Sequence, residues 1–103
     1  MFTHVACFRW TEGTGPGEVA AVEAALGVLP GAIPELRDYR FGADAGVVEG
    51  NHDFAVVATF DDRAGYLAYA GHPTHQRVLT EVIRPRLAAR AAVQFETERA
   101  RTS

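Results

Sequence analysis

The strongest constraint on the fold of this 103-residue chain is the run Phe54–Phe60, which contains six apolar residues and one threonine. A strand with one face in water alternates apolar and polar residues, and this run does not, so it predicts a strand buried on both faces. The two helical regions of the sequence can cover only one face of a sheet. We therefore expect a second copy of the chain to cover the other face, and predict a homodimer.

Periodicity elsewhere in the chain predicts three more strands and two helical regions. The expected order is a strand at 2–10, a helix at 16–29, strands at 36–41 and 54–60, a helical region from 63 to about 85 interrupted at 71–73, and a strand at 89–98. Pro30 and Gly31 are expected to end the first helix. This β-α-β-β-α-β order predicts an α+β, ferredoxin-like fold: one antiparallel four-stranded sheet with both helices on one face. We expect one domain at 1–98 and a polar, frayed tail at 99–103.

Composition excludes several functional classes. The net charge of −3 argues against an electrostatic nucleic-acid binder. All ten basic residues are arginine, so neither a lysine Schiff base nor a lysine-anchored cofactor is possible, and we expect no cofactor. Cys7 is the only cysteine, which rules out an intrachain disulfide. No stretch resembles a membrane helix or a signal peptide, so a soluble cytoplasmic protein is expected, with no membrane partner.

The segment from Tyr69 to His75 carries the chemical hypothesis. His75 lies two residues after Pro73, in the first turn of the predicted helix, where the helix dipole disfavours an imidazolium. A neutral imidazole can serve as a general base, although His75 could equally make one structural hydrogen bond. Tyr69 could place its hydroxyl in a cavity or pack against the first helix. His72 is expected to cap the helix; with His75 it is weak support for a metal, and no metal site is predicted.

The first strand places His4 on the same face as Phe8 and Trp10. His4 is therefore either a hydrogen-bonded core histidine or part of a cavity wall. If this face is hollowed, its aromatic and aliphatic side chains would select a small hydrophobic or aromatic molecule. The candidate ligand-binding residues are His4, Phe8, Tyr39, Phe54 and Val56.

Several motifs together resemble the stress-responsive A/B barrel proteins of the dimeric α/β-barrel superfamily. The most specific is Tyr69 followed by His72-Pro73-Thr74-His75. The others, which spread the resemblance over nearly the whole chain, are His4-Val5, Leu36–Gly42, Asp53–Val57, Phe60–Asp62 and Val93–Phe95.

The resemblance implies two ferredoxin-like subunits packed sheet against sheet, each with a cavity. Among enzymes of this family, plant polyketide cyclases carry out an aldol condensation without a cofactor. By motif position, His75 would be the base, Tyr69 would hold the substrate and His4 would assist; the cyclases have a further histidine where this chain has Phe54. Three functions follow as hypotheses: a small-molecule-binding homodimer, a cofactor-independent cyclase or lyase, and a cofactor-free monooxygenase of the wider superfamily.

Overall fold

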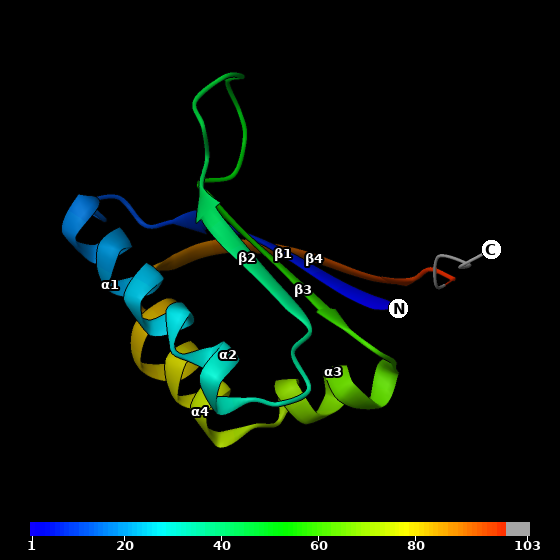
Figure 1. Ribbon diagram of the computed structural model, residues 1–103. Coiled ribbons are helices and arrows are strands. Elements are labelled where there is room, and N and C mark those ends of the chain that lie inside the picture. Colours follow the sequence, from blue (N-terminus) through cyan, green and yellow to red (C-terminus); the bar gives the residue numbers. More distant parts are fainter. Residues whose placement is uncertain (99–103) are drawn as a thin grey trace.

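Four antiparallel strands form a single sheet in the order β2-β3-β1-β4 (Figure 1). The computed structural model describes residues 1–98, and the predicted tail at 99–103 lies outside them. The predicted α+β, ferredoxin-like fold is confirmed. The strands are β1 (Phe2–Trp10), β2 (Asp38–Ala43), β3 (Phe54–Phe60) and β4 (Leu87–Glu96).

All helices cover the same face of the sheet (Figure 1). After β1 the chain forms α1 (Pro16–Gly27) and the short α2 (Leu29–Ala32), and after β3 it forms α3 (Arg63–Ala70) and α4 (Pro73–Val78). The helical path continues from α4 through a π-helical turn, η1 (Leu79–Ile83), and a 3₁₀ turn, η2 (Arg84–Arg86). None of the helices within residues 1–98 is long and apolar enough to cross a membrane.

Three of the predicted elements have displaced boundaries. Strand β2 begins and ends two residues later than predicted, because Leu36 takes part in a turn, donating its amide to the Ile33 carbonyl. Strand β4 likewise begins and ends two residues earlier, at Leu87 and Glu96. Pro30 and Gly31 do not end the first helical region; the break comes at Val28, and Pro30 sits in the first turn of α2, where its missing N–H costs nothing.

The core lies between the sheet and the helices. Alternate residues of β1 and β3 point into it, so Phe2, Ala6 and Phe8 are buried, as are Phe54, Val56, Ala58 and Phe60. The helical segments contribute apolar side chains to the core, and the buried ones are Val22, Leu26, Leu29, Val78 and Ile83.

The other face of the sheet is apolar and has no cover within residues 1–98. Ala55, Val57 and Thr59 of β3 are only half-buried, and on β4 Val93 is 55% exposed and Phe95 is 45% exposed. The unbroken apolar run of β3 thus faces the core on one side and this bare surface on the other.

Candidate functional site

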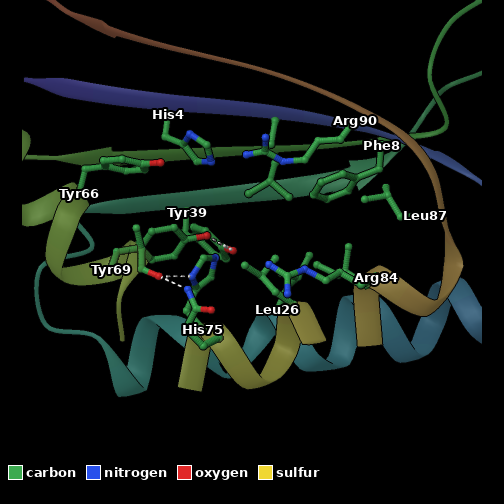
Figure 2. A pocket seen from close by; sticks show the side chains of 16 residues that line it. His4, Phe8, Leu26, Tyr39, Tyr66, Tyr69, His75, Arg84, Leu87 and Arg90 are labelled. Carbon is green, nitrogen blue, oxygen red and sulfur yellow. Dashed lines mark hydrogen bonds between the residues drawn. The ribbon is translucent and has the colours of Figure 1, made fainter. Parts of the chain in front are cut away.

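A cavity of about 280 Å³ lies between the sheet and the helices (Figure 2). Its polar side is formed by histidines, tyrosines and arginines, and its apolar side by Phe8, Leu26, Val56, Ile83 and Leu87. The remaining lining residues are Ala6, Ala70, Gln76 and Leu79. The polar members are His4, Tyr39, Tyr66, Tyr69, His75, Arg84 and Arg90.

Most of the residues singled out from the sequence meet at this cavity. His4 and Phe8 reach it from β1, Tyr39 and Val56 from β2 and β3, and Tyr69 and His75 from the two helices before and after the break at 71–72. These six residues, which lie up to 71 positions apart in the sequence, therefore line the same cavity.

Phe54 is the exception: it was expected in the cavity wall, and it is not among the residues that line this cavity. Its side chain is 2% exposed and fills the core beyond Phe8, with ring centroids 6.4 Å from Phe8, 6.3 Å from Phe41 and 5.7 Å from Trp10. Phe8, its register partner, lines the cavity, whereas Phe54 does not.

His75 is held by the turn that precedes it. His72 is the N-cap of α4, accepting the Thr74 amide at Nδ1 (3.1 Å), and Pro73 occupies the first helical position, as predicted. The Nδ1 atom of His75 lies 3.2 Å from the Ala70 carbonyl oxygen. Because a carbonyl can only accept, Nδ1 carries the proton in this hydrogen bond, and the Nε2 atom of the neutral ring is left as an acceptor.

Burial keeps His75 neutral. Its side chain is 8% exposed, and desolvation is the main cause that lowers its pKa; the charges of Arg90 and His72 lower it further, while the Ala70 carbonyl opposes them. The helix dipole was expected to keep His75 neutral, and burial acts in the same direction. A neutral imidazole with a free Nε2 is a proton acceptor at neutral pH.

Two phenols lie beside His75. The Tyr69 ring packs on the imidazole with a centroid distance of 4.1 Å, and the hydroxyls of Tyr69 and Tyr39 are 3.1 Å apart, in hydrogen-bond contact. Burial raises the pKa of both tyrosines, so both remain protonated, and the hydrogen bond from Tyr39 lowers the pKa of Tyr69 in part. The pair can donate one hydrogen bond to an oxygen atom of a bound molecule.

His4 is neutral for the same reason as His75. It is 5% exposed, and burial, followed by the charges of Arg90 and His75, lowers its pKa from 6.5 to about 4. Gln94, its partner across the β1–β4 ladder, donates from Nε2 to His4 Nδ1 at 2.8 Å. The proton of His4 then resides on Nε2, which makes His4 a donor where His75 is an acceptor.

Four polar residues with long side chains at the site were not predicted from the sequence: Arg84, Arg90, Gln94 and Gln76. Arg90 and Gln94 face inward because β4 pairs Arg90 with Phe8 and Gln94 with His4. Only this register identifies them, since the residues around Arg90 are mostly alanine and show no alternation. Within residues 1–98, no three His, Cys, Asp or Glu side chains gather as a set of metal ligands.

Comparison with known proteins identifies the family. A sequence profile described as the Stress responsive A/B Barrel Domain matches residues 2–97. No curated protein matches the sequence.

Solved structures agree with the profile. A dimeric ferredoxin-like protein of unknown function from Thermobifida fusca YX is 50% identical, with a TM-score of 0.87 over 93% of this chain and 90% of that chain. A dimeric protein of ferredoxin-like fold and unknown function from Bacteroides fragilis NCTC 9343 is 22% identical, with a TM-score of 0.80 over 93% and 95%. A hydroxynitrile lyase from Passiflora edulis is 17% identical, with a TM-score of 0.82 over 98% and 96%. The resemblance carried by the sequence motifs is thereby confirmed, and the chain belongs to the stress responsive A/B barrel domain family.

Proposed function

We propose that this protein is a homodimer whose cavity binds a small apolar or aromatic molecule. The observation that carries the proposal is the cavity itself: apolar walls on one side, and on the other a few convergent polar groups with perturbed pKa values. Ligand sites are built in this way, and the volume of about 280 Å³ lies just below their usual range of roughly 300–1,000 Å³, which suits a small ligand.

Two observations support the homodimer. The sheet face opposite the helices is apolar and bare, and a second copy of the same face would cover it with matching apolar surface. The structures from Thermobifida fusca and Bacteroides fragilis are both described as dimeric.

Acetophenone, a small neutral aromatic ketone, tests the binding proposal. We expect a titration followed by two-dimensional NMR to shift the amide signals around the cavity, with those of Ala6, Val56 and Ile83 prominent among them. Leu79→Trp fills the cavity from its wall and is expected to weaken binding at least tenfold.

Leu67→Trp is the matched control, because Leu67 is 59% exposed on α3 and does not line the cavity. This variant should bind acetophenone as the unmodified protein does. Shifts scattered over the surface, or equal binding by both variants, would contradict a ligand site in this cavity.

A cofactor-independent lyase or cyclase is the second candidate function, and one observation favours it. The free Nε2 of His75 can take a proton from a bound molecule while Tyr69, hydrogen-bonded to Tyr39, donates to the oxygen on which charge develops. His4 would supply a further donor. The Passiflora edulis protein is a lyase of this fold, but at 17% identity that likeness supports the fold alone. The monooxygenase hypothesis stays a prediction from the wider superfamily.

A further inference from the structure

Two arginines at the cavity have no partner among residues 1–98. Arg84 and Arg90 both line the cavity, yet neither side chain makes an ion pair or a hydrogen bond with a described residue. Other arginines of this chain do find carboxylates: Arg37 lies 3.0 Å from Asp61, Arg40 lies 3.1 Å from Asp38, and Arg63 lies 3.5 Å from Glu96.

The charge of the two cavity arginines is not balanced within the cavity. None of the residues that line it is Asp or Glu, and the two histidines and three tyrosines of the lining hold no negative charge at neutral pH. The positive charge of Arg90 acts on residues of three elements, since it lowers the pKa of His4 in β1, of Tyr69 in α3 and of His75 in α4. Both arginines are exposed to solvent, so the positive charge lies on the solvent-facing side of the cavity.

The two side chains are directed at the same space. Arg90 extends from β4, where its register partner is Phe8, and Arg84 follows the π-helical turn. Figure 2 shows both guanidinium groups pointing inward, toward the region between the Phe8 ring and the group formed by His4 and His75. A guanidinium is a planar fork of donors that matches the two oxygens of a carboxylate.

We propose that the natural ligand of this cavity is a small aromatic or apolar carboxylic acid, bound as its anion with the carboxylate on Arg84 and Arg90. Its apolar part would lie against Phe8, Leu26 and Ile83, and its far end would reach Tyr69 and His75. This inference rests on the proposed ligand-binding function and adds the chemical class of the ligand. A carboxylate is smaller than a phosphate group. It fits better here, because an aromatic ring leaves little further room in a cavity of about 280 Å³.

The experiment compares phenylacetate with phenylacetamide, which has nearly the same shape and no charge. Calorimetric or NMR titration of the full chain at low salt is expected to show phenylacetate binding about tenfold more tightly or better, since a charge-assisted pair is roughly twice as strong as a neutral hydrogen bond. Arg84→Gln and Arg90→Gln should each lower the affinity for phenylacetate much more than the affinity for phenylacetamide, and so remove most of this preference. Arg77→Gln is the matched control, because Arg77 is exposed, as Arg84 and Arg90 are, but does not line the cavity.

The outcomes separate this inference from the function on which it rests. Equal affinities for acid and amide, or a preference that survives in the Arg84→Gln/Arg90→Gln double variant, would overturn the carboxylate assignment and leave the ligand site standing. Tighter binding of phenyl phosphate than of phenylacetate would also overturn it. Binding of neither acid nor amide at millimolar concentration would overturn both proposals. Circular dichroism spectra that match the unmodified protein show that each variant is folded.

Discussion

At the scale of single residues, the site depends on which nitrogen of each histidine carries a proton. The Ala70 carbonyl assigns the proton of His75 to Nδ1, and the Gln94 amide assigns that of His4 to Nε2. The two rings thus have opposite hydrogen-bonding roles although both are neutral and buried. An arrangement of one acceptor and one donor across a cavity suits proton transfer better than two identical rings would.

His75 is the residue on which the enzyme hypothesis depends. If Nε2 abstracts protons from an enolisable ligand, the protein should accelerate deuterium exchange at the methyl group of acetophenone in D₂O, followed by proton NMR. His75→Gln is expected to lower the protein-dependent rate by about 100-fold or more, the usual contribution of a positioned base. His52→Gln, on the loop between β2 and β3, should leave it unchanged. Exchange that is equally fast in His75→Gln would remove the proposed base.

His4 predicts a pH dependence of stability. Its pKa in the folded protein, about 4, lies below its ordinary value of 6.5, so the unfolded chain binds more protons between these values. Stability should therefore be greatest above pH 6.5 and fall as the pH decreases toward 4. The free energy of unfolding, measured with urea, should fall between pH 7 and pH 5 for the unmodified protein. For His4→Gln this fall is expected to be smaller by about 1–2 kcal/mol, a figure that includes a discount for solvent screening. Identical pH slopes for the two proteins would show that His4 is not held neutral by the fold.

The sequence predicted the histidines and Tyr69 but not the arginines, for a physical reason. His4, Tyr69 and His75 are rare residue types within clearly periodic segments or a recognisable motif. Arg84 and Arg90 are two of ten arginines, and their role depends on strand register and on a distorted helical turn. Phe54 does not line the cavity for a related reason: the face of β3 on which it lies could be predicted, but its position relative to the helices could not.

At the scale of elements, the order and type were predictable because each segment has its own hydrophobic period. The end of the second helical region was not. The spacing of Val78, Leu79, Val82 and Ile83 predicted one continuous helix, whereas the structure widens into a π-helical turn at Leu79–Ile83 and then tightens into a 3₁₀ turn. Pro85, in the 3₁₀ turn, cannot donate the N–H that a continued helix would require. Leu79, Ile83 and Arg84 of this distorted region all line the cavity, and π-helical turns are frequent at functional sites.

At the scale of the whole molecule, the sheet separates two surfaces. The helix-covered face contains the cavity, and the bare face carries the apolar residues that we assign to the homodimer, including Val5, Val57, Val93 and Phe95. Val5 pairs with Val57 on one side and with Val93 on the other, so these three form an apolar row across the sheet. Ligand binding and dimer formation should therefore respond to different sets of substitutions.

A charge placed on the bare face tests the homodimer. We expect light scattering at micromolar concentration to give twice the chain mass of 11.1 kDa for the unmodified protein. Val93→Glu should give the mass of one chain, with the dimer weakened at least 100-fold, because two copies of the new carboxylate would be buried without partners. Val47→Glu, at a loop position that is 83% exposed, should remain dimeric. A monomeric unmodified protein, or a dimeric Val93→Glu variant, would contradict the proposed interface.

The alternation of β1 has a consequence for how this chain can change in length. His4, Ala6 and Phe8 line the cavity, while Thr3, Val5 and Cys7 between them face the opposite way. Because the period of a strand is two, one inserted or deleted residue in β1 would exchange the two sets. The histidine would then lie on the apolar outer face, and the valine would lie in the cavity. A single insertion would thus disable ligand recognition and assembly together, although most substitutions affect only one of them. Additions and losses of residues are far better tolerated in the long connection between β2 and β3, which extends away from the sheet (Figure 1).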